Sequence, residues 1–239
     1  MVSFSRGLLV VLALVCISDV AAEASLLGSN LIKNGDAESG PGSSSGGTVS
    51  NIPNWTTSGN FTVVQYDAPG GFPTSSGPGP ASRGNNFFAG GPNNGFSSAS
   101  QTIDISSIAS QVDTGSIVFS LTGYLGGFSN QNDNAVLKID FLDGSASSLG
   151  VAQIGPVLAS DRSNTTGLFF RSTAGNLPVG TRAIGVTLEM TRTAGSYNDG
   201  YADNLSFVLQ SNAVPEPASL AMWSILGVGL VCLVRRVRS

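Results

Sequence analysis

The stretch Ala183-Ile184-Gly185-Val186-Thr187-Leu188-Glu189-Met190-Thr191 decides the fold class of this 239-residue chain. Large apolar side chains occupy every second position, and small, hydroxyl or charged side chains occupy the positions between them. Because successive side chains of a β-strand point to opposite faces, the alternation predicts a strand with one buried face. A helix would instead repeat its apolar positions every three or four residues.

The same alternation predicts further strands along the chain. Residues 116–121 and 135–142 alternate clearly, and their inward side chains are Ile117, Phe119, Leu121, Leu137, Ile139 and Phe141. Weaker patterns predict strands at 61–66, 101–105, 149–154, 168–172 and 205–209. Glycine, serine, asparagine and threonine separate these segments, and no stretch between residues 25 and 213 shows a helical period. The pattern predicts an all-β sandwich of about eight strands in two sheets.

Two long segments without strand character interrupt the pattern. Residues 40–47 and 69–84 are rich in glycine, proline and serine, which is typical either of flexible surface loops or of a rim that shapes a ligand cleft. The run Tyr197-Asn198-Asp199-Gly200-Tyr201 has turn composition, so we expect it to join the last two strands.

The first 24 residues are typical of a signal peptide. Arg6 gives a short basic start, and residues 8–17 form a continuous apolar run. Val20-Ala21-Ala22 and Ala22-Glu23-Ala24 each suit signal peptidase. We therefore expect a signal peptide at 1–24, followed by a body at 25–213 that is long enough for one domain with a proper core.

Composition excludes several kinds of chemistry. Both cysteines, Cys16 and Cys232, lie outside the body, and the chain has no histidine. The body therefore has no disulfide, no cysteine nucleophile, no histidine-based triad and no imidazole-bound zinc. It carries seven basic and twelve acidic residues, a balance of −5, which makes nucleic acid an unsuitable partner.

The end of the chain combines three features in a fixed order. Pro215-Glu216-Pro217 precedes an apolar run at 218–234, and three arginines follow within the last five residues. As a helix, the run would extend roughly 25 Å, just enough to cross a bilayer. The arginines would stay in the cytoplasm and leave the body on the far side of the membrane.

This tail, residues 214–239, resembles the PEP-CTERM sorting signal of exported bacterial proteins. The resemblance implies that an exosortase reads Pro215, Glu216 and Pro217, and that the protein passes through an inner-membrane-anchored stage before reaching the cell surface or extracellular matrix. An ordinary C-terminal anchor is the alternative, and both readings export the body.

Two segments of the body resemble galactose-binding-like jelly rolls, which are common among carbohydrate-binding modules. They are Asn30-Leu31-Ile32-Lys33-Asn34-Gly35-Asp36-Ala37-Glu38 and Asp199-Gly200-Tyr201-Ala202-Asp203-Asn204-Leu205-Ser206. The resemblance implies a jelly-roll β-sandwich whose first and last strands are close together and hold a structural calcium ion. Its acidic ligands would be Asp36, Glu38 and Asp203, although turn contacts would equally explain these carboxylates. Ala37 replaces the usual phenylalanine and removes a core side chain.

A polysaccharide site would need aromatic planes beside amides and carboxylates, because sugar faces stack on rings and hydroxyls seek polar partners. The main candidates are Trp55, Tyr124, Tyr197 and Tyr201. Further candidates are Phe72 and Phe128, with Asn130, Asn132 and Asp133 as polar neighbours. Packing in the core is the alternative for each ring.

The function that these observations predict is non-enzymatic: an exported cell-surface or matrix protein that binds extracellular polysaccharide or has a structural role in it. One alternative is a glycan hydrolase, since two carboxylates suffice for that reaction; the available pairs are Asp140 with Asp143 and Asp199 with Asp203. The other is a purely architectural surface protein without a ligand site.

Overall fold

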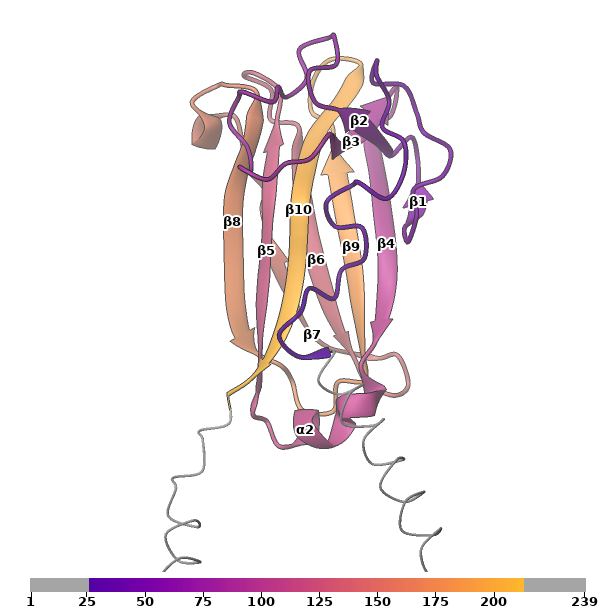
Figure 1. Ribbon diagram of the computed structural model, residues 1–239, viewed down its shortest axis with the longest axis vertical. Helices are drawn as coiled ribbons and strands as arrows, with labels where there is room; N and C mark the ends of the chain where they lie inside the picture. The colour runs from indigo at the N-terminus through magenta and orange to yellow at the C-terminus, as the bar shows by residue number, and fades with distance from the viewer. Residues whose placement is uncertain (1–25, 213–239) are drawn as a thin grey trace, which may run out of the picture.

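The computed structural model describes residues 26–212, which form two five-stranded antiparallel sheets packed face to face (Figure 1). The first sheet has the order β1-β4-β9-β6-β7 and the second the order β2-β3-β10-β5-β8. The strands of the first sheet are β1 (Thr56–Ser58), β4 (Phe96–Asp104), β9 (Ala183–Thr191), β6 (Asn134–Leu142) and β7 (Ser148–Ile154). Those of the second are β2 (Thr62–Gln65), β3 (Asn86–Pro92), β10 (Tyr197–Ser211), β5 (Ile117–Gly127) and β8 (Gly167–Asn176). Short helical turns are η1 (Ser106–Ile108), α2 (Ala109–Asp113) and η2 (Ser160–Arg162).

The predicted β-sandwich is therefore confirmed, and its core comes from the alternating strands. Ile184, Val186, Leu188 and Met190 of β9 are fully or almost fully buried between the sheets. The predicted inward side chains of β5 and β6 are buried in the same core. Burial of one face along each strand is the main force that holds the two sheets together.

The prediction of a turn at Tyr197–Tyr201 is wrong. These residues begin β10, which pairs with β3 and β5, although the register with β3 shifts between Asn198 and Tyr201. Asparagine, aspartate and glycine are present because the strand is irregular there, and irregular strands and turns favour the same residue types.

Strand β3 has no counterpart in the sequence prediction because both of its faces are buried. Phe88 points into the core between the sheets, whereas Phe87 belongs to a second apolar cluster on the outer face of the second sheet. This cluster comprises Val64, Tyr66, Ala68, Phe72, Phe87, Ala89, Leu168 and Tyr201. A strand that is covered on both sides loses the alternation that reveals a half-buried strand. The segment that covers β3 includes the start of the predicted 69–84 loop.

The N-terminal segment lies beside the last strand. Leu27 pairs with Leu209 and Asn30 with Val208, as Figure 1 shows for the indigo segment along β10. This placement confirms that the two ends of the body are neighbours. They lie at the end of the sandwich that carries α2, whereas β10 begins and β5 ends at the opposite end, among long loops (Figure 1). We call the latter the loop end.

The predicted signal peptide at 1–24 and the sorting tail at 214–239, with its helix at 218–234, lie outside the described residues. Within residues 26–212, no helix has the length and apolar character needed to cross a membrane.

Candidate functional site

Irregularities in β10 place side chains at two hollows. On the core-facing side of β10, the buried residues Ala202 and Leu205 are three positions apart, whereas a regular strand would space them by two. The register with β5 shifts at the same place, between Asp203 and Ser206. Asn204 has a left-handed backbone with φ 48°. Such a bulge adds one residue to the strand and turns the following side chains to the other face. The second irregularity, between Asn198 and Tyr201, lies at the loop end.

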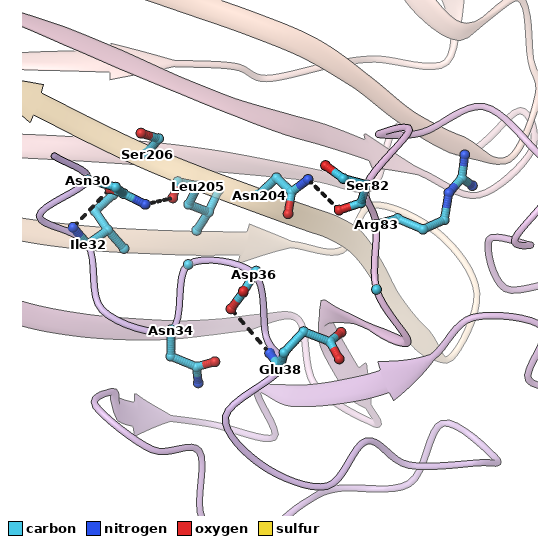
Figure 2. A pocket seen from close by; sticks show the side chains of 12 residues that line it. Asn30, Ile32, Asn34, Asp36, Glu38, Ser82, Arg83, Asn204, Leu205 and Ser206 are labelled. Carbon is cyan, nitrogen blue, oxygen red and sulfur yellow. Dashed lines mark hydrogen bonds between the residues drawn. The ribbon is translucent and has the colours of Figure 1, made fainter.

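The hollow beside Asn204, which we call the polar hollow, has a volume of about 500 Å³ (Figure 2). It lies between the N-terminal segment, residues 82–84 and the bulge of β10. Its lining consists of Asn30, Ile32, Asn34, Gly35, Asp36, Glu38, Ser82, Arg83, Gly84, Asn204, Leu205 and Ser206. Asn204 donates to the carbonyl of Ser82 (3.1 Å) and so ties the bulge to this loop.

The asparagines of the first segment, which line the polar hollow, also hold neighbouring segments together. Asn30 donates through Nδ2 to the carbonyl of Leu205 (2.9 Å), and its Oδ1 accepts from the backbone N–H of Phe207 (3.0 Å). Asn34 donates to the carbonyl of Pro53 (3.0 Å). A Cβ on Gly35 would lie 2.3 Å from the carbonyl oxygen of Leu205, so the close approach of the two segments requires glycine. The two sequence segments that resemble a jelly roll are therefore neighbours, as predicted, because these hydrogen bonds and Gly35 hold them together.

The three predicted calcium ligands are largely engaged with protein groups. Glu38 Oε1 accepts from the backbone N–H groups of Asn85 (2.9 Å) and Asn86 (2.7 Å), and Asp36 Oδ1 accepts from the backbone N–H of Glu38 (3.3 Å). Asp203 is fully buried and accepts from the hydroxyl of Tyr66 (2.7 Å). Within residues 26–212, no three cysteine, aspartate or glutamate side chains gather closely enough to hold a metal ion. Calcium at these residues stays a prediction from the sequence, and it has no part in the function proposed below.

The electrostatics of Asp203 are nevertheless unusual. Burial raises the pKa of its carboxyl to about 8, and the charges of Glu38 and Asp36 add to the rise. The hydrogen bonds from Tyr66 and from the backbone of Asn204 oppose it. Because a buried, incompletely compensated carboxylate is costly, Asp203 is a site where pH and stability are coupled.

A second hollow of about 240 Å³ lies at the loop end, and we call it the aromatic pocket. Its lining consists of Ser45, Pro69, Gly70, Phe72, Phe128, Tyr197 and Asp199. Phe72 contacts Tyr197 edge to face, with 5.1 Å between ring centroids, and it also packs on Tyr201 below (6.2 Å). Ser45, Pro69 and Gly70 are exposed and form the rim. The 69–84 segment thus begins as one wall of a hollow, as one of its two readings expected.

The carboxylate of Asp199 belongs to a buried polar group beside this pocket. Its Oδ1 accepts from the Tyr201 hydroxyl, whereas Oδ2 has no hydrogen-bond partner among the described residues. Burial raises the pKa of Asp199 to about 6; the bond from Tyr201 and the charge of Arg162 oppose the rise, and the charge of Asp133 adds to it. The hydroxyl of Tyr197 is buried and also lacks a partner among residues 26–212. A ligand in the pocket would gain a hydrogen bond by pairing with Oδ2 of Asp199, whereas the buried hydroxyl of Tyr197 is closed to it.

Asp133 and Arg162 support the pocket from beneath. Asp133 accepts through Oδ1 from the backbone N–H groups of Thr193 (2.6 Å) and Ala194 (3.0 Å), and through Oδ2 from that of Asp199 (3.0 Å). Arg162, only 1% exposed, donates to the carbonyl oxygens of Ser129 (2.9 Å) and Gln131 (2.8 Å) and also to that of Thr165. These bonds fix the loops that follow β5 and precede β10. Sequence reasoning named Asp133 as a site candidate but not Arg162, because a single arginine, here the last residue of η2, gives no signal of burial.

The predicted ligand-binding rings do not share one surface. Trp55 is 7% exposed, packs against Phe88 and donates its indole N–H to the carbonyl of Asn34 (3.1 Å). Tyr201 is fully buried. A buried ring offers no face to a sugar, so both residues belong to the packing of the body.

Of the other predicted rings, Tyr197 joins Phe72 and Phe128 at the aromatic pocket. Tyr124 lies on the outer face of the second sheet opposite Phe170, with 5.5 Å between ring centroids. Phe170 is 52% exposed, so this pair is a separate aromatic surface.

The carboxylate pairs considered for hydrolysis are used locally or separated. Asp143 Oδ1 accepts from the backbone N–H groups of Ser145 (2.8 Å) and Ser147 (2.9 Å), and these bonds hold the turn between β6 and β7. Asp140 accepts from the hydroxyl of Ser148. Asp199 lines the aromatic pocket, whereas Asp203 lines neither hollow.

Comparisons with known proteins find similar folds only among solved structures; no family model and no curated protein matches the chain. The carbohydrate-binding module TmCBM61, solved with β-1,4-galactotriose, is 16% identical over 76% of this chain and 98% of its own, with a TM-score of 0.41. A family 16 carbohydrate-binding module is 15% identical over 75% of this chain and 99% of its own, with a TM-score of 0.44. A cyclase from Fischerella sp. TAU is 17% identical over 78% of this chain and 99% of its own, with a TM-score of 0.48.

The enzymatically active domain of bacteriophage CBA120 tailspike protein 4 is 18% identical over 75% of this chain, with a TM-score of 0.44, but the match covers only 21% of the tailspike chain. Two binding modules and two enzymes thus occur at the same low similarity. These likenesses carry no conclusion about the ligand or the reaction of this chain.

Proposed function

We propose that residues 25–213 are a non-enzymatic carbohydrate-binding domain of an exported protein, and that a sugar unit binds in the aromatic pocket. The observation that carries this proposal is the pocket itself: the partly exposed rings of Phe128 and Tyr197 and a carboxylate oxygen of Asp199 without a hydrogen-bond partner among the described residues, around one small hollow floored by Phe72. Rings supply apolar faces for the C–H side of a pyranose, and Oδ2 of Asp199 supplies an acceptor for its hydroxyl groups.

The size of the pocket favours a single sugar unit at the end of a chain or on a branch. Its volume of about 240 Å³ lies below the ~300–1,000 Å³ of pockets that enclose drug-sized ligands. One unit would leave the rest of a polysaccharide outside, beyond the exposed rim of Ser45, Pro69 and Gly70. We therefore expect weak binding per site, which many copies on a cell surface would strengthen.

The position of the pocket suits a surface protein. β10 starts at the pocket with Tyr197 and runs 15 residues to Ser211, a length of roughly 45–50 Å. We propose that the tail at 214–239, which follows this strand, is the sorting signal that an exosortase reads through Pro215, Glu216 and Pro217, after signal peptidase has removed residues 1–24. A tail held in the inner membrane would then leave the pocket at the far end of the body, facing outward.

A glycan array probed with residues 25–213 tests the proposal. We expect binding to a subset of glycans, and we expect Tyr197→Ala and Phe128→Ala to lower it at least tenfold. Phe170→Ala is the matched control, because it removes an exposed ring from another surface and should leave binding unchanged. Binding that survives both pocket substitutions would exclude the aromatic pocket, and binding that disappears with Phe170→Ala would move the site to the surface formed by Tyr124 and Phe170.

The same protein distinguishes the two alternatives. A hydrolase would release reducing sugar from a polysaccharide, and the Asp199→Asn variant would lose this activity. The carboxyl of Asp199 is the candidate because its pKa, raised to about 6, is near that of a catalytic acid. A purely architectural protein would bind no glycan in any variant.

A further inference from the structure

We propose that the aromatic pocket is selective for a positively charged sugar unit, namely an amino sugar with a free ammonium group. This inference rests on the proposed function and names the class of sugar. It follows from the charges around the pocket, from the unpaired carboxylate oxygen of Asp199 in its wall, and from the kind of rings that surround it.

The buried charges beside the pocket do not balance. Asp133 and Asp199 are buried carboxylates, and Arg162 is the buried guanidinium that lies among them. Four donors surround Asp133: the N–H groups of Thr193, Ala194 and Asp199 and the Thr193 hydroxyl. Arg162 donates its hydrogen bonds to backbone carbonyl oxygens and not to either carboxylate. When Asp199 is ionised, the group therefore carries one excess negative charge that no described side chain pairs directly.

The excess charge faces the pocket. Of the carboxylates in this group, Asp199 is the one that lines the hollow, and its Oδ2 has no partner among the described residues. Within the described part of the chain, no lysine or arginine belongs to the lining. An ammonium group placed at Oδ2 would form a charge-assisted hydrogen bond, which is roughly twice as strong as a neutral one.

The surrounding rings favour the same ligand charge. Phe72, Phe128 and Tyr197 present aromatic groups around the carboxylate, and aromatic faces attract cations through their quadrupole. A neutral sugar would gain only the stacking and the hydroxyl contacts. An anionic sugar would meet the carboxylate of Asp199 and be repelled. A cationic unit is the ligand that uses every feature of the pocket.

Calorimetric titration of residues 25–213 with matched oligosaccharides tests the inference. Oligomers of glucosamine and of N-acetylglucosamine have the same backbone, and acetylation removes the charge. We expect the free amine form to bind at least tenfold more tightly at pH 7. Asp199→Asn should abolish this difference, whereas Asp140→Asn, a matched loss of a carboxylate on β6, should preserve it. Thermal melting of each variant shows whether it is folded.

Tetramethylammonium is a second probe, because its charge does not change with pH. Its affinity should rise about tenfold between pH 5 and pH 7.5, as Asp199, with a pKa of about 6, becomes ionised. Arg162, Asp133 and the hydroxyls of Tyr201 and Tyr197 are the other titratable groups that face Asp199, and burial and the charge of Asp199 raise the pKa of both tyrosines above the ordinary value of 10.0.

The outcomes separate the two proposals. Equal binding of the acetylated and free oligomers, or a neutral sugar that binds more tightly than both, overturns the cationic selectivity and leaves carbohydrate binding in place. A flat pH profile for tetramethylammonium also overturns the selectivity. If no oligosaccharide of any charge binds the folded protein, both proposals fail.

Discussion

Replacement of Asp203 should change how the stability of the body depends on pH. The carboxyl has an ordinary pKa of 3.8 and a pKa of about 8 in the folded protein, because it is buried. Between these two values the folded state binds more protons than the unfolded state. The contribution of this group to the free energy of unfolding is therefore highest below pH 4 and falls as pH rises toward 8.

The size of the effect follows from the shift. One pKa unit corresponds to about 1.4 kcal/mol, and the folded carboxyl stays mostly protonated between pH 5 and pH 8 while the unfolded one is ionised. Asp203 should thus remove roughly 4 kcal/mol of stability over this range, a large part of the ~5–15 kcal/mol of a typical domain. Asp199, with a pKa of about 6, adds to the same slope at its lower end.

Urea denaturation of residues 25–213 at pH 5, 6, 7 and 8, in the presence of a chelator, measures this slope. The Asp203→Asn variant should lose most of it, whereas Asp140→Asn should retain it. The Tyr66 hydroxyl can still donate to the amide oxygen of the substituted side chain, so we expect the variant to fold. A slope that is identical in wild type and Asp203→Asn, or stability that rises from pH 5 to pH 8, would refute the reasoning.

Three further predictions concern stability. Gly35→Ala should lower the melting temperature by several degrees, because its Cβ would lie 2.3 Å from the carbonyl oxygen of Leu205; Gly95→Ala, with open space around it, should have little effect, and equal melting of the two variants would contradict the packing described. Arg162→Met should lower the free energy of unfolding by about 3 kcal/mol or more in urea titrations, since three carbonyl oxygens lose their donors, and a loss below ~1 kcal/mol would count against the buried network. Finally, the calcium expected from the sequence stays a prediction: millimolar calcium should raise the melting temperature at pH 8 if Asp36, Glu38 and Asp203 hold it, and identical curves in calcium and in chelator would remove it.

Sequence alone could predict the strands that are half buried. β5, β6 and β9 alternate cleanly because one face meets the core and the other meets water. β3 could not be found in this way, since Phe87 and Phe88 are buried on opposite faces. The outer face of β3 is covered by the loop that joins β2 to β3. This contact depends on the tertiary structure and leaves no periodic pattern in the sequence of β3.

The candidate site was predicted in part for a similar reason. Composition marked Phe128 and Tyr197 as rings that could meet a sugar, but it could not separate these partly exposed rings from Phe72, Trp55 and Tyr201, which are buried. Ring type says nothing about exposure, which is decided by the loops that fold over the second sheet. The acidic residues near the start and end of the body were expected to share a metal, yet hydrogen bonds to backbone N–H groups account for Glu38.

The central claim is that the loop end of the sandwich binds a sugar in the aromatic pocket. The most direct measurement is a two-dimensional NMR titration of isotope-labelled residues 25–213 with the tightest-binding oligosaccharide. The account predicts that the amide signals of residues 69–72, 128 and 197–199 shift together and saturate with one dissociation constant. Shifts confined to residues 30–38 and 203–206, or to β8 around Phe170, would contradict it.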